Sequence, residues 1–172
     1  MNKFLKDKWL KRYLDIAKNV ALWSKDPNKK IGSIIVNENG NIISQGYNGF
    51  PRNIKDDDRY NDKKIKNIYV VHAEVNATLN ALYNGASVKD CSIFISGLPP
   101  CHECAKIIIQ SGIKNVIFDT LLNKESSWYQ SNLNALKMLD EAHLSCFYVN
   151  DNAYKVFNFN NQDYYILQKD QI

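Results

Sequence analysis

The sequence predicts an α/β protein in which helices cover both faces of a five-stranded mixed sheet, a three-layer α/β/α sandwich. Segments with helical and strand-like hydrophobic patterns follow each other in the order helix, strand, strand, helix, strand, helix, strand, helix, strand. Strands separated by helices become parallel neighbours, because each crossover returns the chain to the same sheet edge. A tight Asn39-Gly40 turn instead makes the first two strands antiparallel. The length of 172 residues, 45% hydrophobic and 23% charged, suits one globular domain.

The first predicted helix ends near residue 24 and is recognised by its hydrophobic period. Its apolar residues recur at steps of three and four, the spacing that keeps them on one helix face: Leu5, Trp9, Tyr13, Ile16, Val20 and Trp23. Pro27 stops the helix, since the residue before a proline avoids helical dihedral angles. Strands are expected at residues 31–36 and 41–47, on either side of the Asn39-Gly40 turn.

A long polar segment, residues 48–68, is expected to be a loop, and loops of this length in compact domains are usually functional or disordered. Beyond it, three predicted helices cover residues 72–83, 101–111 and 131–143. They alternate with three predicted strands at residues 91–96, 113–118 and 144–149.

The apolar faces of two of these helices follow from their spacing. One face of the helix at 72–83 carries Val75, Leu79 and Leu82. The helix at 131–143 has a core stripe of Leu133, Leu136 and Leu139. We assign residues 1–150 to one domain and residues 151–172 to a C-terminal extension, in which segment 153–168 fits either a hairpin or another helix.

The charge distribution argues against a nucleic-acid partner. The formal net charge is +4 and the basic residues are scattered, whereas nucleic-acid binders usually carry a dense basic stripe. No run of about 18 apolar residues could span a membrane, and the N-terminal residues lack the apolar core of a secretory signal. We therefore expect a cytoplasmic, reducing environment, in which the four cysteines are thiols or metal ligands. Cys91 and Cys146 lie in apolar runs typical of buried core thiols.

Two predicted helices begin with residues that bind metals. His72-Ala-Glu74 opens one, and Pro100-Cys-His-Glu-Cys104 opens another. Zn²⁺ takes Cys thiolate and His imidazole, and catalytic zinc sites keep three protein ligands and one water. Cys101 and Cys104 are one helical turn apart, so both sulfurs can face one ion, and the helix N-terminus stabilises their thiolate forms. We therefore predict a Zn²⁺ site formed by His72, Cys101 and Cys104.

Other interpretations of these residues stay open. A C-x-x-C pair alone is also typical of redox sites, and His72 alone could be a core or capping residue. His102 could close a structural zinc site as a fourth ligand, although on a helix it points about 100° away from Cys101. Glu74 favours a catalytic site, because a carboxylate two residues from a ligand can reach the metal-bound water.

The combination of H-x-E with P-C-x-x-C is the signature of zinc-dependent base deaminases. In that chemistry the zinc-bound water is acidified, and Glu74 would take its proton, passing it to the ring nitrogen and later to the leaving amine. Either motif alone is a weak signal. Both motifs in this order, each at the start of a helix, together predict a deaminase.

The chain resembles the deoxycytidylate (dCMP) deaminase family, within the cytidine deaminase-like superfamily, from about Trp23 to Val149. The matching stretches are Ser24-Lys-Asp-Pro27, Gly46-Tyr-Asn-Gly-Phe-Pro-Arg52, His72-Ala-Glu-Val-Asn-Ala77, Pro100-Cys-His-Glu-Cys-Ala-Lys106, Ile108-Ile-Gln-Ser-Gly-Ile113 and Met138-Leu-Asp-Glu-Ala142. The resemblance implies the cytidine deaminase-like fold and zinc-dependent hydrolytic deamination of dCMP to dUMP and ammonia. The dUMP would supply dTTP precursors in pyrimidine deoxynucleotide metabolism.

The resemblance also implies substrate contacts and partners. Asn48 would contact the substrate sugar, and the backbone N–H of Ala73 would help to read the pyrimidine carbonyl. Many members form homo-oligomers, often hexamers, and many are activated by dCTP and inhibited by dTTP. Asn48 could instead be only a turn residue, since Asn-Gly pairs are common in turns.

Two of the three arginines, Arg52 and Arg59, lie in the 48–68 segment. A guanidinium forms two parallel hydrogen bonds to a phosphate, so we expect a preference for the 5′-monophosphate, with Arg52 as the contact. Alternatively, Arg59 pairs with an aspartate at positions 56–58 on the surface and Arg52 merely solvates the loop. A third interpretation is that both arginines bind the phosphates of an effector nucleotide.

The chain departs from the family after the predicted strand at 113–118. The family often has Asp-Lys-Tyr in that region, whereas this chain has Asp119-Thr-Leu-Leu-Asn-Lys124. This difference weakens any transfer of the family's phosphate contacts from that region.

Two alternative functions remain. A deaminase acting on a base in tRNA or single-stranded nucleic acid would need a basic or aromatic groove. A non-catalytic zinc-binding relative of the fold would not need Glu74.

Overall fold

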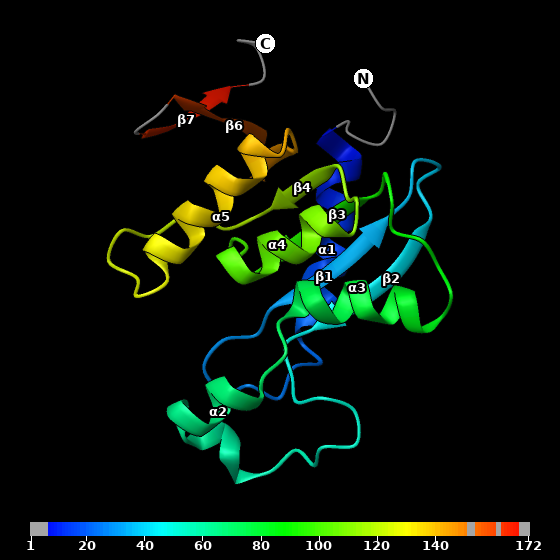
Figure 1. Ribbon diagram of the computed structural model, residues 1–172, viewed down its shortest axis with the longest axis vertical. Helices are drawn as coiled ribbons and strands as arrows, with labels where there is room; N and C mark the ends of the chain where they lie inside the picture. The colour runs from blue at the N-terminus through cyan, green and yellow to red at the C-terminus, as the bar shows by residue number, and fades with distance from the viewer. Residues whose placement is uncertain (1–6, 151–153, 161–162, 169–172) are drawn as a thin grey trace.

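The computed structural model describes residues 7–150, 154–160 and 163–168. Its strands form one seven-stranded sheet with the order β2-β1-β3-β4-β5-β6-β7 (Figure 1). The strands are β1 (Gly32–Val36), β2 (Ile42–Tyr47), β3 (Ser92–Ser96), β4 (Asn115–Phe118), β5 (Ser145–Val149), β6 (Tyr154–Asn160) and β7 (Asp163–Gln168). The helices are α1 (Asp7–Ala21), α2 (Lys63–Tyr69), α3 (Ala73–Tyr83), α4 (His102–Gln110) and α5 (Tyr129–Glu141).

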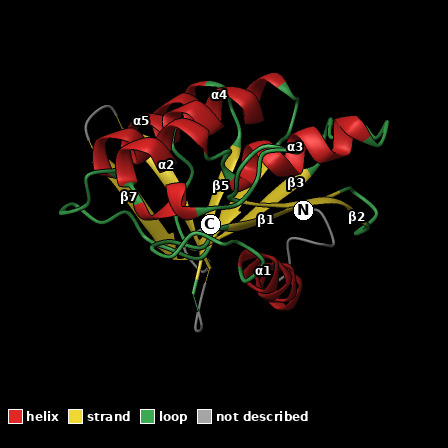
Figure 2. Ribbon diagram, turned by 90° about the horizontal axis from the view of Figure 1, so that it is seen from below, coloured by secondary structure: helices red, strands yellow, loops and turns green. Residues whose placement is uncertain are grey.

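The predicted three-layer architecture is confirmed. Helix α1 covers one face of the sheet, while α3, α4 and α5 cover the other (Figure 2). Strands β3, β4 and β5 are parallel, and β1 is antiparallel to both β2 and β3. All five predicted strands are present in this mixed arrangement. The segment that fitted a hairpin or a helix is a hairpin: β6 pairs with β5, and β7 pairs with β6, both antiparallel.

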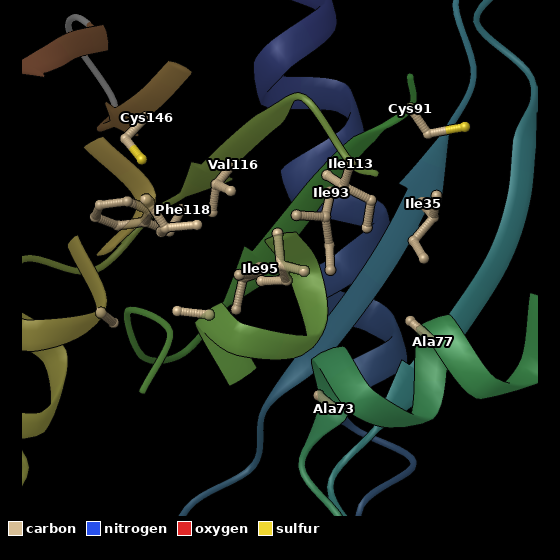
Figure 3. Packing of buried hydrophobic residues seen from close by; sticks show 14 of the residues in the cluster. Ile35, Ala73, Ala77, Cys91, Ile93, Ile95, Ile113, Val116, Phe118 and Cys146 are labelled. Carbon is tan, nitrogen blue, oxygen red and sulfur yellow. The ribbon is translucent and has the colours of Figure 1, made fainter. Parts of the chain in front are cut away.

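The central strands are buried on both faces, which explains their nearly continuous apolar sequences. Successive residues alternate between two cores: Ile34 and Phe94 contact the α1 side, whereas Ile35, Ile93 and Ile95 contact the α3–α5 side. Figure 3 shows the second core, in which apolar residues of β1, β3 and β4 lie between the sheet and the helices. Cys91 and Cys146 are buried in this core, as predicted.

The predicted hydrophobic face of α3 is wrong. Leu79 and Leu82 are 48% and 71% exposed, and the face that packs on the sheet consists of small residues, among them Ala77. The reason is a close approach between backbones: a Cβ built on Gly46 of β2 would lie 2.3 Å from the Ala77 nitrogen. A leucine has no room at such a contact, so it is placed on the outer face.

The stripe predicted for the first helix is only partly correct. Tyr13 and Val20 are buried, but Ile16 and Trp23 are exposed, and Leu10 and Ala17 complete the buried face instead. Helix α1 starts at Asp7, and the remaining predicted position, residue 5, lies outside the described residues. The buried face of α1 is therefore rotated about the helix axis relative to the face that was predicted from the large apolar residues alone. The stripe predicted for α5 is confirmed, since Leu136 and Leu139 are buried and Leu133 packs against them.

The segment at 48–68 is not simply a loop. It contains a 3₁₀ helix at Asp58–Asn61 and most of α2, and two of the aspartates that made it look polar, Asp57 and Asp62, cap these elements. Asp62, for example, accepts hydrogen bonds from two backbone N–H groups in the first turn of α2. The segment is anchored to the rest of the molecule by Lys66, which is buried and lies 2.9 Å from a carboxylate oxygen of Asp26.

Candidate functional site

Three metal-ligating side chains meet where α3 and α4 begin. The Nδ1 atom of His72 lies 3.3 Å from the sulfur of Cys101 and 3.3 Å from the sulfur of Cys104. One ligand atom from each residue lies within 4.8 Å of the other two. Both cysteines are buried, and His72 is partly buried. The structure therefore brings together all three residues that the sequence predicted as ligands.

The local backbone explains why these side chains are available. His72 is the N-cap residue of α3 and Cys101 is the N-cap residue of α4, yet neither side chain makes a capping hydrogen bond. N-cap residues usually satisfy the free N–H groups of the first turn with a side-chain oxygen. Imidazole and thiolate are instead the donors that Zn²⁺ prefers, and three of them suit a site that keeps one open position. The residues present therefore fit zinc.

Hydrogen bonding and burial set the protonation of the site. Hydrogen bonds from the Cys104 thiol and from His72 lower the pKa of Cys101 to about 4, so that Cys101 is a thiolate at neutral pH. The neighbouring Cys101 thiolate, together with burial, raises the pKa of Cys104. Cys101 is therefore the more acidic of the two sulfurs, and metal binding displaces thiol protons because only thiolates are ligands.

Glu74 lies in the first turn of α3, two residues after His72, and only 5% of its surface is exposed. Burial is the largest influence on its carboxyl group and raises the pKa of Glu74. General acid–base catalysis requires a group that can both accept and donate a proton, and burial shifts the pKa of Glu74 toward that condition. Ala73 lies between His72 and Glu74 and is completely buried.

Asn48 occupies the centre of a turn that adjoins the site. Its Oδ1 atom accepts a hydrogen bond from the Ile31 N–H at 2.8 Å, and its Nδ2 group donates to the Lys29 carbonyl at 2.9 Å. The next residue, Gly49, forms an isolated β-bridge with Val71, which immediately precedes the ligand His72. The turn is thereby fixed to the start of α3, and the contact between Asn48 and a substrate sugar stays a prediction.

Arg52 lies on the outer side of α3. Its guanidinium donates a hydrogen bond to Asn80 and stacks on the Tyr83 ring at 4.5 Å from the ring centroid. It lines a cavity of about 290 Å³, whose walls also include Lys25 and Tyr60. Among the described residues, none of the three predicted metal ligands lines this cavity. The contact between Arg52 and a substrate phosphate stays a prediction.

The surface pairing considered for Arg59 is confirmed. Its Nε atom lies 2.7 Å from a carboxylate oxygen of Asp57, and its guanidinium also lies over the rings of Phe50 and Tyr69.

His102 points away from the metal centre, as expected for the residue after Cys101. Its Nδ1 atom lies 2.7 Å from the hydroxyl oxygen of Ser131 on α5. The metal-ligating cluster found in the described part of the chain does not include His102.

Sequence reasoning missed three residues near the site. The Trp128 ring meets the His72 ring edge-on, with 6.0 Å between centroids. Ser131 and Asn132, in the first turn of α5, contact the segment that carries Cys101. No motif signals them, because their partners are backbone groups and two histidine rings more than 25 positions away in the sequence. Within the described residues, no helix is long and apolar enough to cross a membrane.

Comparison with known proteins places this geometry among deaminases. The family model of the cytidine and deoxycytidylate deaminase zinc-binding region matches residues 7–120. A probable deoxycytidylate deaminase of Caenorhabditis elegans is 41% identical over 137 residues, which cover 77% of this chain and 66% of that protein. The human deoxycytidylate deaminase is 45% identical over 116 residues, 64% of each chain. The matched part thus spans slightly less than two thirds of these relatives.

Solved structures support the same fold. The dCMP deaminase from cyanophage S-TIM5 in complex with dCMP and dUMP superposes with a TM-score of 0.71 at 24% sequence identity. The superposition covers 85% of this chain and 98% of the phage chain. The apo form of the same enzyme gives a TM-score of 0.65. The cytidine deaminase-like fold predicted from the sequence is therefore confirmed.

Proposed function

The chain belongs to the cytidine and deoxycytidylate deaminase family, and from this membership we propose that it is a zinc-dependent enzyme that converts dCMP and water into dUMP and ammonia. The observation that carries the proposal is the cluster of three ligand atoms within 4.8 Å of one another, next to the buried carboxyl group of Glu74. The proposed role in metabolism is the supply of dUMP as a precursor of dTTP.

Each residue of the candidate site has a distinct proposed role. His72, Cys101 and Cys104 would hold a zinc ion, whose chemistry is to lower the pKa of a water toward neutrality and so supply the nucleophile. Glu74 would accept one proton of the attacking water and deliver it to the pyrimidine ring nitrogen. It would then take the proton of the new hydroxyl group on the ring carbon and pass it to the amine, which leaves as ammonia when the C–N bond breaks. The backbone N–H of Ala73 would orient the pyrimidine carbonyl, and Asn48 would contact the sugar.

The alternative functions have less support. A nucleic-acid deaminase would need a basic or aromatic groove for the strand, and the basic residues of this chain are scattered. A non-catalytic zinc protein would have no need for Glu74, and burying its carboxyl group costs free energy that a purely structural site would not require. We therefore favour the free nucleotide dCMP as substrate, with Arg52 as the proposed phosphate contact.

We extend the proposal to partners, location and domain division. The cavity beside Arg52 is lined by Asn76 and Asn80 and by Lys25, which pairs with Asp56 in the same wall, and we propose that Arg52 and the two amide side chains bind an anionic effector such as dCTP or dTTP there. The exposed apolar residues of α3, among them Leu82, suit a contact with another copy of the chain in a homo-oligomer such as a hexamer. The four cysteines, none of which forms a disulfide, suit the reducing cytoplasm. We retain residues 1–150 as the deaminase domain and 151–172 as an extension.

A panel of substrates tests the proposed reaction. Ammonia release is measured with dCMP, CMP, dCTP, deoxycytidine and a tRNA anticodon stem, each with the wild-type chain and with Glu74→Gln as the matched control. We expect dCMP to react at least about tenfold faster than the other substrates, and the control to be nearly inactive with all of them. Faster reaction of the tRNA stem would favour the nucleic-acid alternative, and no ammonia from any substrate would favour the non-catalytic one.

A further inference from the structure

Helix α5 begins directly against the segment that carries the metal ligands of α4. Asn132, in the first turns of α5, is a polar residue with only 4% of its surface exposed. Its Nδ2 group donates hydrogen bonds to the carbonyl oxygens of Pro99 and Pro100, each at 3.0 Å. These two prolines immediately precede the ligand Cys101. One side chain therefore holds two consecutive peptide groups next to the metal centre.

The carbonyl groups of Pro99 and Pro100 need an outside donor. Both prolines are buried and lie between β3 and α4, where neither a sheet ladder nor a helix supplies a hydrogen bond. A buried carbonyl group without a partner destabilises the fold by about as much as a lost hydrogen bond. The start of the same segment is held in a similar way, since the Gly97 N–H donates to the carboxylate of Asp119 at 3.0 Å.

Ser131 makes a second contact, with the first residue of α4. Its hydroxyl oxygen accepts a hydrogen bond from the His102 N–H at 3.3 Å. That N–H is one of the first-turn donors that have no acceptor within the helix. An N-cap side chain usually accepts from the second or third residue of a helix, and Cys101, the N-cap residue of α4, makes no such bond because its sulfur is directed at the ligand cluster. Ser131 of the neighbouring helix therefore satisfies one donor in a turn that has no side-chain cap of its own.

We propose that Ser131 and Asn132 are positioning residues for the zinc centre. They do not belong to the ligand cluster, and they act by fixing the backbone of residues 99–102, from which the sulfur of Cys101 is directed toward His72. Outer residues that orient ligands in this way typically contribute about 10–100-fold to metal affinity. The inference concerns metal binding alone, so it stands or fails independently of the proposed substrate.

The experiment replaces the donor without adding charge near the thiolates. Asn132→Leu has nearly the same shape as the wild-type side chain but leaves both proline carbonyls without their donor. The matched control is Asn134→Leu, two residues further along α5, where the side chain is partly exposed and accepts a hydrogen bond from Gln130 on the same helix. The rate of zinc transfer to a chromogenic chelator is measured for each purified protein, and the absorption spectrum is recorded after replacement of zinc by Co²⁺.

We expect Asn132→Leu to release zinc about 10–100-fold faster than the wild type and to alter the cobalt–thiolate absorption bands, while the control matches the wild type. If Asn132→Leu does not fold, Ser131→Ala gives the same test, with a release rate increased by at least about threefold. A release rate within about twofold of wild type, or an unchanged cobalt spectrum in a variant whose metal-free form melts at a lower temperature, would overturn the proposal. The second result would mean that the contacts stabilise the fold without positioning the ligands.

Discussion

Replacing Lys66 by methionine should destabilise the protein more than any other single change on α2. The Lys66 ammonium lies 2.9 Å from a carboxylate oxygen of Asp26, and the two side chains are only 8% and 5% exposed. At this distance, and with an effective dielectric constant of about 20, the attraction between the charges is about 6 kcal/mol. Desolvation offsets part of it, and removing one partner of a buried pair usually costs about 3–5 kcal/mol. For a chain of this size that loss lowers Tm by roughly 6–20 °C.

The pH dependence of stability should change sign in the same variant. Burial acts to raise the pKa of Asp26, but hydrogen bonds from Lys66 and from the N–H groups of Asn28 and Lys29 outweigh it and lower that pKa. In the wild type, Asp26 therefore stabilises the fold above pH about 4, and this contribution is lost as the pH falls further. In Lys66→Met, burial dominates and raises the pKa of Asp26, so the free energy of unfolding should decrease as the pH rises from about 4 to about 7.

Urea unfolding at several pH values measures both effects. Lys64→Met is the matched control, because Lys64 is on the same helix and exposed, and it should cost less than about 0.5 kcal/mol. The double variant Asp26→Asn with Lys66→Met should recover part of the loss, since no buried charge remains. A loss below about 1 kcal/mol in Lys66→Met, or an unchanged pH dependence, would refute the assignment of this pair as the anchor of the 48–68 segment.

Three further predictions concern the proposed reaction. Glu74→Gln should keep the fold and the zinc but lose about 10²–10⁴-fold in kcat, and activity within about tenfold of wild type would contradict the role of Glu74. Metal analysis should find about one zinc per chain, lost in the Cys101→Ser, Cys104→Ser double variant; retained zinc would exclude these ligands. Arg52→Ala should lower kcat/KM for dCMP by about tenfold and leave deoxycytidine unchanged, whereas a change only in the dCTP response would assign Arg52 to an effector.

The metal ligands could be predicted because their signal is local. His72 and Glu74, and likewise Cys101 and Cys104, occur at short fixed spacings beside helix starts, and the chemistry of zinc restricts which residue types can act together. The strands could be predicted for a similar reason, since burial on both faces leaves a continuous apolar run. For the ligands and for the strands alike, the residues that determine the structure lie within a few positions of one another, so a short sequence pattern is enough to predict it.

The outer face of α3 could not be predicted from the sequence of α3 alone. Leu79 and Leu82 have the spacing of a core face, but the distance between α3 and β2 is set by Gly46, which lies outside the helix. Asn132 was missed for a related reason. Its partners are carbonyl groups 33 and 32 residues away, and backbone groups leave no signature in the sequence.

The link between α5 and the metal-binding turn has a consequence for the order of events during synthesis. Asn132 follows Cys104 by 28 residues, so at about 5–20 residues per second the ribosome completes the cysteine pair roughly 1.4–5.6 s before it adds the side chain that holds their backbone. During that interval the thiols of the nascent chain are open to oxidation and to exchange of loosely held metal. Nascent chains stalled with Asn132 outside the ribosomal tunnel should therefore retain zinc against a chelator better than chains stalled with Asn132 still inside it.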